Sequence, residues 1–450
     1  MSYPIYPEYC DRVALGGIEC PSGWPIERLR FSILSNPVRS EVSDWAEETL
    51  VSFVPMEAVG EQGEIDASLE RPIGDVYTGY TYFAERDILI AKITPCFENG
   101  KGAIATGLTN GVGFGTTEFH VLRPLQNMDA TWLFYLTKSD VFRKIGGSAM
   151  LGAGGQKRVQ EDFIKDFRTG IPTLVEQQQI ATFLDWKTSQ IDALIAKKQE
   201  LLDKLKEKRL AVITQAVTKG LNADAPMRDS GISWLGKVPV HWGVKRLKFV
   251  ARIGNGSTPN REDPTYWEEG VYPWLNSSVV NQEAVTSADQ FVTPLALAEC
   301  HLPRIQPPAV LVGITGQGRT RGMASTLLFE ATINQHLAYV KPDEEKAVVG
   351  FLRRVFDMAY SHLRSESENG GSTKGAITCA QIAELPVPVP PLVEQTAIAE
   401  YVDATIAKLS RMVENAESAI TRLTEYRTAL ITAATTGKID VRNVAIPVHA

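Results

Sequence analysis

Basic and amide side chains in glycine-rich loops are the residues of this 450-residue chain best suited to recognise a nucleic acid. In proteins that read DNA, Arg and Lys bond guanine, Asn and Gln bond adenine, and other polar groups contact phosphate. Segment 315–321, with the sequence TGQGRTR, offers Gln317, Arg319 and Arg321 among glycines that let a backbone approach phosphate closely. We therefore expect this loop to contact DNA.

Further candidates occur in both halves of the chain. In the first half they flank a glycine-containing turn near residue 100 and follow the GAGG segment 152–155. In the second half, one pair follows an apolar run, and a lysine follows a GGST segment. The DNA-contact candidates are Lys92, Thr94, Asn99, Lys101, Gln156, Lys157, Arg158, Asn334, Gln335 and Lys374. The alternative for the turn residues is ordinary solvation, and Asn334 could simply cap a turn.

Motifs of catalysis and metal binding are missing from the sequence. Gly100-Lys101 continues with Gly rather than the Ser or Thr of a phosphate-binding Walker A loop, and there is no G-x-S-x-G or H-E-x-x-H. There is also no Asn- or Asp-Pro-Pro-aromatic tetrapeptide, as an amino-methyltransferase would carry. The five cysteines are scattered, which argues against a disulfide framework or a zinc site. We therefore expect no catalytic residues, no metal and no cofactor in this chain.

Net charge and hydropathy indicate which classes of protein remain possible. The net charge of −7 leaves DNA binding open, because phosphate binding depends on a local basic surface rather than on the total. No apolar stretch is long enough to span a bilayer, and the first residues do not form a signal peptide. The expectation is a cytoplasmic protein without membrane contact.

The elements that must position these loops occur twice. PTLVEQQQIATFLD begins at Pro172 and PPLVEQTAIAEYVD begins at Pro390, an offset of 218 residues with eight of fourteen positions identical. WPIERLRF at Trp24 and WGVKRLKF at Trp242 share the same offset. Two separate blocks with one offset identify a tandem duplication.

A long helix is predicted in each half. Neither segment contains an interior glycine or a proline beyond its first turn, Thr173 and Glu176 have capping-box spacing, and Gly220 and Gly437 stand where a C-terminal cap belongs. Each helix would measure roughly 65 Å at 1.5 Å per residue. Apolar residues repeat every seven positions and predict a seam between the helices. The predicted seam residues are Ile191, Leu194, Leu201, Leu205, Val212, Leu409, Met412, Leu423 and Leu430.

The predicted fold is α/β (α+β): two globular heads joined by an antiparallel two-helix coiled coil with pseudo-two-fold symmetry. Short β-type runs separated by turn residues predict strand-rich heads. The predicted divisions are a first head at 1–170, a first helix at 171–222, a linker with the second head at 223–388, a second helix at 389–437 and a tail at 438–450. The alternative for the helices is packing within ordinary domain cores.

Across essentially its whole length the chain resembles the specificity subunit of type I restriction-modification enzymes. The resemblance rests on both LVEQ-led helices, on linker 229–242 (DSGISWLGKVPVHW) and on 436–442 (TGKIDVR). It also rests on 87–104 in the first head and, in the second, on Gly256-Ser-Thr-Pro259, Tyr266-Trp267 and 272–276 (YPWLN). The heads would be the target recognition domains of that family.

The resemblance implies a non-catalytic DNA reader. Each head would recognise half of a split target, and the helices would set the gap and dock two methyltransferase subunits. Restriction subunits would complete the nuclease, and these partners would use S-adenosylmethionine, ATP and Mg²⁺. Two other functions stay open: a coiled-coil scaffold without a DNA role, and a DNA methyltransferase or nuclease with its own reader.

Overall fold

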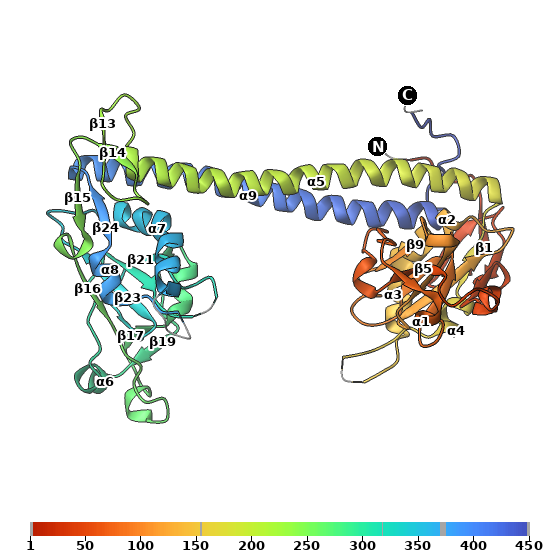
Figure 1. The fold of residues 1–450 in the computed structure, drawn as a ribbon, viewed down its shortest axis with the longest axis horizontal. Coiled ribbons are helices and arrows are strands. Elements are labelled where there is room, and N and C mark those ends of the chain that lie inside the picture. Colours follow the sequence, from red (N-terminus) through yellow and green to blue (C-terminus); the bar gives the residue numbers. More distant parts are fainter. Residues whose placement is uncertain (1–2, 154, 317, 370–374, 448–450) are drawn as a thin grey trace. The chain divides into compact units, whose positions relative to one another are not determined.

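The computed structural model describes residues 3–153, 155–316, 318–369 and 375–447, and these divide into two compact units. Unit 1 comprises residues up to Gln199 together with those from Ser418 onward, and unit 2 comprises Glu200–Glu417. Each unit therefore contains one globular head, part of the first long helix and part of the second (Figure 1).

The head of unit 1 contains two four-stranded sheets with strand orders β6-β5-β10-β7 and β4-β11-β8-β9, and two smaller pairs, β1-β2 and β12-β3. Its strands are β1 (Tyr9–Ala14), β2 (Ile18–Pro21), β3 (Ile26–Arg28), β4 (Ile33–Ser35), β5 (Leu50–Val54), β6 (Glu70–Pro72), β7 (Thr81–Ala84), β8 (Ile88–Ala91), β9 (Gly102–Ile104), β10 (Val112–Gly115), β11 (Phe119–Pro124) and β12 (Arg168–Gly170). Its short helices are α1 (Ile73–Val76), α2 (Ala130–Lys138), α3 (Asp140–Ser148) and α4 (Glu161–Asp166).

The head of unit 2 has a five-stranded sheet of order β16-β23-β20-β21-β18, a three-stranded sheet β19-β17-β22, and the pairs β13-β14 and β15-β24. Its strands are β13 (Met227–Asp229), β14 (Lys237–Pro239), β15 (Gly243–Arg246), β16 (Ala251–Asn255), β17 (Tyr272–Leu275), β18 (Ala284–Val285), β19 (Gln290–Val292), β20 (Ala309–Gly313), β21 (Ala324–Leu327), β22 (Thr332–Ile333), β23 (Leu337–Pro342) and β24 (Pro386–Val389). Its own helices are α6 (Pro294–Glu299), α7 (Val349–Asn369) and α8 (Cys379–Glu384).

Apolar runs and capping residues explain these local structures. All four residues of β8, Ile-Leu-Ile-Ala, are buried, as expected of a strand covered on both faces. Asp129 accepts a hydrogen bond from the backbone of Trp132 at the start of α2, and Ser139 caps α3 in the same way. The heads are thus the mixed α and β structures that the sequence predicts.

The two long helices are α5 (Leu174–Lys219) and α9 (Leu392–Thr435). Gly220 and Gly437, directly beyond or near their ends, both have φ of +76°, the left-handed conformation that ends many helices and favours glycine. A side chain at Gly220 would press on the Trp242 ring, and one at Gly437 would collide with Pro21 near Trp24. The repeated Trp blocks therefore pack against the ends of the repeated helices.

In unit 1 the first part of α5 and the last part of α9 reach the same head. Gln177, close to the start of α5, bonds the head, and Thr432, close to the end of α9, accepts a hydrogen bond from the backbone of Asp140. Farther along, Arg427 of α9 pairs with Asp192 of α5 at 2.9 and 3.2 Å. Within this unit the two helices are therefore antiparallel.

The predicted seam was wrong at Leu194 and Met412. Ile191, Leu205, Leu409 and Leu430 are buried, and Leu201, Val212 and Leu423 are half-buried, but Leu194 and Met412 are 49% and 47% exposed. The residues one position later are buried or half-buried, and the sequence already indicates that they widen the apolar stripe: Ile195 and Leu202 of α5, and Val413 and Ile420 of α9. A residue repeated every seven positions marks one inward-facing position of the heptad. It does not by itself show whether the second inward-facing position lies three or four residues after the first.

A charged residue explains part of this error. Arg427 takes the inward position after Ile420 and is only 8% exposed, because its guanidinium is paired with Asp192. Apolar spacing alone does not predict that a charged residue faces inward, and it favours the neighbouring Tyr426, which is exposed.

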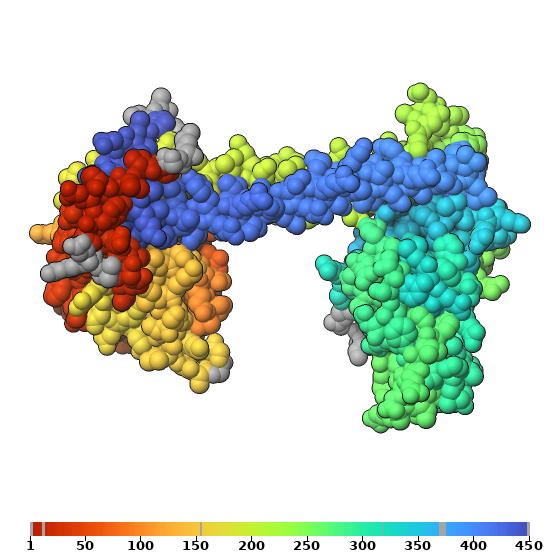
Figure 2. Space-filling model, turned by 180° about the vertical axis from the view of Figure 1, so that it is seen from behind, coloured from red at the N-terminus to blue at the C-terminus, as the bar shows by residue number. Residues whose placement is uncertain are grey.

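The segment after α9 folds onto the head of unit 1. The backbone of Asp440 donates to the carbonyl of Pro4, the Tyr9 hydroxyl donates to the carbonyl of Gly437, and Val441 is buried in the core. Figure 2 shows these red and dark blue segments side by side. The predicted tail is thus an integral part of unit 1 as far as residue 447.

Candidate nucleic-acid interface

In each unit, one buried glutamine attaches the head to the long helix that follows it. The amide of Gln177 donates to the carbonyls of Asn127 and Pro172 and accepts from the backbone of Asp129. Gln395 makes the equivalent bonds to Lys346, Pro390 and Val348. All these bonds are 2.7 to 3.0 Å long. The last residue of each LVEQ motif therefore fixes the orientation of a head relative to the helix that follows it.

A second attachment differs between the units. In unit 1 the Tyr135 hydroxyl donates to Asp185 of α5 at 2.7 Å, whereas in unit 2 Arg354 donates to Asp403 of α9 at 2.7 and 2.9 Å. Both aspartates end the fourteen-residue repeat. The helices thus keep one attachment residue while the heads supply different partners for it.

In the head of unit 1, short β-type contacts bring together candidates that are far apart in sequence. The backbone of Thr94 donates to the carbonyl of Lys157 at 3.0 Å, and that of Val159 donates to Lys92 at 2.9 Å. Ile93 and Arg158 form an antiparallel bridge. Lys92, Thr94, Lys157 and Arg158 therefore belong to one surface, which sequence spacing alone does not show.

Arg158 on this surface is held by a carboxylate that sequence reasoning missed. Its Nε and Nη2 donate to Glu118 at 2.8 to 3.1 Å, and Glu118 has a pKa lowered by these bonds and by the charges of Arg158 and Lys92. The pair occupies the Nε–Nη2 edge of the guanidinium. Glu118 lies in the short turn between β10 and β11, and nothing in its local sequence identifies it.

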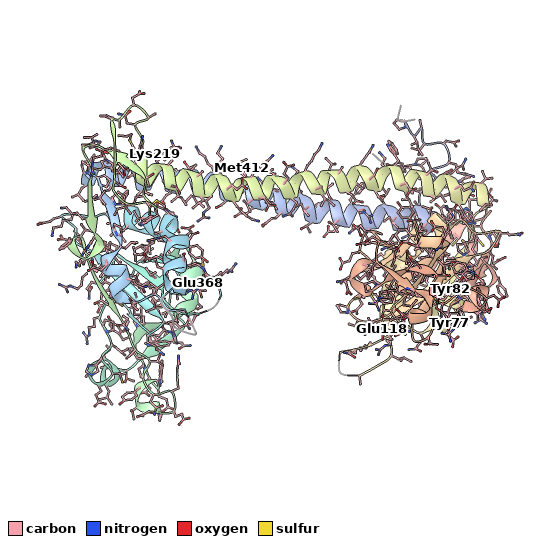
Figure 3. The ribbon with its side chains drawn as sticks, viewed as in Figure 1. Tyr77, Tyr82, Glu118, Lys219, Glu368 and Met412 are labelled. Carbon is pink, nitrogen blue, oxygen red and sulfur yellow. The ribbon has the colours of Figure 1, made fainter. Side chains whose placement is uncertain are left out.

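A hollow of about 670 Å³ opens beside Lys92. Aromatic and basic side chains line it, and Figure 3 shows Tyr77, Tyr82 and Glu118 in this part of the head. Burial and a hydrogen bond to Glu41 raise the pKa of Tyr82 to about 12, so its hydroxyl remains protonated. Burial lowers the pKa of His120, which favours a neutral ring beside the carbonyl of Val159. The lining includes Arg39, Tyr77, Tyr80, Tyr82, Lys92 and His120.

The remaining candidates of unit 1 are more dispersed. Asn99 is exposed, but its amide donates to Glu61 at 3.0 Å. Lys101 is half-buried at the end of the same turn, and Gln156 and Lys157 are exposed in the loop that follows α3. Of these, Gln156 and Lys157 present the most open side chains.

The glycine-rich loop of unit 2 departs from the prediction at Arg321. Arg319 is exposed, but Arg321 is 4% exposed, and its guanidinium donates to the carbonyl of Gly375 and to Glu368 at 2.8 and 2.7 Å. A buried guanidinium with these partners ties the loop to the end of α7 and has no open edge for a base. Gln317 and Lys374 lie outside the described residues.

Asn334 takes the turn-capping role that the sequence left open. It is 5% exposed, and its side-chain oxygen accepts from the backbone of His336 at 3.0 Å. Gln335 is exposed and accepts from Thr258 at 2.5 Å, and His336 bonds Thr315 at 2.7 Å. These contacts bring segment 256–259 and the loop of Arg319 to one polar surface.

A basic hollow of about 780 Å³ lies beside the same loop. Arg319, Lys206 and Arg209 line it together with Arg353 of α7. Arg209, Arg353 and Arg354 all contact Glu283, and their charges lower its pKa although burial, the largest single influence, raises it. Lys206 and Arg209 of α5 thus adjoin the head of unit 2 at this point.

The described ranges 3–153, 155–316, 318–369 and 375–447 offer neither a metal site nor a membrane-spanning helix. Nowhere in those ranges do three or more His, Cys, Asp or Glu side chains converge as metal ligands would. None of the helices described there is both long enough and apolar enough to cross a membrane. What the arrangement offers chemically is hydrogen bonding and charge on two polar surfaces, one in each head.

Comparison with known proteins gives relatives of one kind. The model of the type I restriction modification DNA specificity domain matches residues 73–207 and 239–422. The EcoAI and EcoEI specificity subunits of Escherichia coli are 45% and 41% identical over 166 and 165 residues, which is 36% of this chain. The chain spans only 27% of the length of each of these two relatives. A putative type I specificity subunit, MjaX of Methanocaldococcus jannaschii, is 24% identical over 79% of both chains.

Solved structures share the fold. A chain from a study of assembly and conformational transition in a type I R-M system covers 93% of this chain with a TM-score of 0.74 and 19% identity. The HsdS subunit from Thermoanaerobacter tengcongensis covers 94% with a TM-score of 0.58 and 18% identity. The family match extends over both halves of the duplication and most of the chain, so this protein belongs to the family of type I restriction modification DNA specificity domains.

Proposed function

We propose that this chain is the DNA-binding specificity subunit of a type I restriction-modification complex and directs it to a bipartite, gapped target. The observation that carries the proposal is the match of a DNA specificity domain to each half of a duplicated chain. Two heads attached to their helices by the same glutamine bonds, but bearing different polar surfaces, suit the reading of two different half-sites.

Each head would read its half-site with its own polar surface. In unit 1 the reading groups would be Lys92, Lys157 and Arg158, beside the hollow lined by tyrosines. In unit 2 they would be Arg319 and Gln335. Arginine with a free bidentate edge suits guanine, and a glutamine amide suits adenine.

The chain itself would be non-catalytic, and its partners would supply the chemistry. Two methyltransferase subunits would dock on α5 and α9, whose sequences match more closely than those of the heads. Restriction subunits would join them. S-adenosylmethionine, ATP and Mg²⁺ would be used by these partners in the cytoplasm.

Co-expression with the methyltransferase subunit tests the proposal. Single-molecule sequencing of host DNA should show adenine methylation at one motif made of two defined halves separated by unspecified bases. Methylation at an ungapped motif, or none in the presence of a folded complex, would overturn the proposal. Fluorescence anisotropy with random and target DNA separates a DNA reader from a scaffold, because a scaffold binds neither.

A further inference from the structure

A buried lysine in the head of unit 1 is held by backbone carbonyls. Lys138 ends α2, is 6% exposed, and donates to the carbonyls of Glu61, Gly100 and Gly102 at 2.5 to 3.1 Å. The Phe134 ring lies 4.8 Å from its Nζ. An ammonium has three donors, and this cage provides one carbonyl for each of them.

The charges around this ammonium come from every element that packs on it. Arg143 of α3 and Arg427 of α9 disfavour its positive charge, and Glu61 and Glu64 of the loop before β6 favour it. Burial is the largest influence, and together these effects lower the pKa of Lys138 to about 7. The group therefore changes its charge close to neutral pH, whereas an exposed lysine stays protonated.

The cage holds the turn that carries four candidate DNA contacts. Gly100 and Gly102 flank Lys101, and the turn between β8 and β9 also carries Lys92, Thr94 and Asn99. Asn99 bonds the side chain of Glu61, whose carbonyl the lysine also holds. Lys138 thus joins both loops to α2 from beneath the candidate surface.

The equivalent position in the described part of unit 2 carries a different residue. Asp129 and Val348 are equivalent, because their backbones bond the two matching glutamines. Counting forward from them, Lys138 corresponds to Asp357, which pairs with Arg353 and Arg354. Any effect of the lysine should therefore concern the first head alone.

We propose that Lys138 is a positioning residue for DNA recognition by the first head: its ammonium holds turn 92–101 in the conformation that reads the first half-site. This proposal rests on the proposed function. A neutral amine has two donors and a lone pair, so one of the three carbonyls loses its hydrogen bond. The turn then loosens, and the first half-site is read less well as the pH rises through neutrality, while reading of the second half-site is unchanged.

The test uses the full chain in complex with its methyltransferase subunits and three DNA duplexes: the target, and variants with either half-site scrambled. Binding is measured by anisotropy from pH 6 to pH 8.5 at fixed salt. For the natural protein, discrimination at the first half-site should fall about tenfold over this range, the size expected for one charge-assisted hydrogen bond. Discrimination at the second half-site should stay constant.

Variants separate positioning from general structure. Lys138→Met keeps the length of the side chain but has no donor, so its first half-site discrimination should be low and independent of pH. Lys138→Arg keeps its charge at every pH, so its profile should also be flat. Lys144→Met removes an exposed lysine of α3 and should leave the natural profile intact, because that side chain is 76% exposed.

The outcomes are distinguishable. A flat first half-site profile for the natural protein overturns the proposal, and so does a folded Lys138→Met protein that keeps the natural pH dependence. The profile of the natural protein decides the matter even where a variant does not fold. A natural complex that shows no half-site discrimination at any pH contradicts the proposed function itself.

Discussion

At the scale of single residues, the two arginines of the TGQGRTR loop have separate roles although the sequence treats them alike. Arg319 is exposed beside a basic hollow, whereas Arg321 is buried and bonded to Gly375 and Glu368. A residue that reads DNA changes sequence preference when it is removed, and one that holds a loop changes stability. The structure therefore predicts that removing Arg319 changes sequence preference and that removing Arg321 changes stability.

Replacing Arg319 by Ala should cost about 1–3 kcal/mol of binding free energy at one position of the second half-site if it contacts a base there. Replacing Arg321 by Ala should instead lower the free energy of unfolding by about 1–3 kcal/mol, because two hydrogen bonds of a buried charged group are lost. Anisotropy with half-site variants and urea unfolding measure the two effects. Equal loss at both half-sites in Arg319→Ala would contradict a reading role.

Arg158 provides the corresponding test in unit 1. Glu118 holds its Nε–Nη2 edge, which leaves the other edge for a guanine. Arg158→Lys keeps the charge but cannot make the bidentate contact, so it should relax one guanine position of the first half-site by roughly tenfold or more. Methylation sequencing reads the motif directly. An unchanged motif would show that the pair serves only to hold its loop.

At the scale of elements, the sequence predicts both long helices within about three residues at each end but places the exposed Leu194 and Met412 in their seam. Capping residues and glycines mark helix ends locally, so one sequence is sufficient for them. Which residue faces inward depends on a partner helix and on a buried ion pair between Arg427 and Asp192, and neither is a local property.

Neighbouring residues of α9 test the observed seam. Leu409→Ala should lower the free energy of unfolding by about 2–5 kcal/mol, because a buried leucine leaves a cavity. Met412→Ala should change it by less than about 0.5 kcal/mol, since that side chain is half in water. Urea unfolding of the full chain measures both. Comparable losses of unfolding free energy in the two variants would instead support the predicted seam, in which Met412 faces inward.

The candidate surfaces were predicted less completely than the helices. Residue type and flanking glycines find Lys92, Lys157, Arg158 and Arg319, but only the fold brings the first three together. Three other features carry no sequence signal, because their importance comes from neighbours that are distant in sequence: Glu118, Lys138, and the tyrosines that line the hollow beside Lys92. Arg321 shows the opposite error, since it has the residue type and flanking glycines of a DNA contact but is buried.

At the scale of the whole molecule, continuous helices α5 and α9 each begin in one unit and end in the other. Under the proposed function they set the gap between half-sites. Inserting seven residues into the middle of both helices preserves the heptad register, unlike an insertion of four. The addition of about 10 Å should lengthen the gap by about three base pairs.

Methylation sequencing checks this expectation with the two half-sequences as internal controls. Both halves should be unchanged, because the heads are untouched. An unchanged gap would mean that another part of the complex determines the spacing. The same seven residues placed in only one helix should disturb the seam and reduce methylation.

The division of the chain also sets an order for folding on the ribosome. Unit 2 is one continuous stretch, Glu200–Glu417, so it can be completed as soon as that stretch has emerged. Unit 1 must wait for residues beyond Glu417, since Asp440 bonds Pro4 and the Trp24 region covers the end of α9. The head that is synthesised first is therefore completed second, and a nascent chain exposes apolar surface of that head until the end of α9 and the segment after it have emerged. During that interval the head of unit 2 is complete and the head of unit 1 is not.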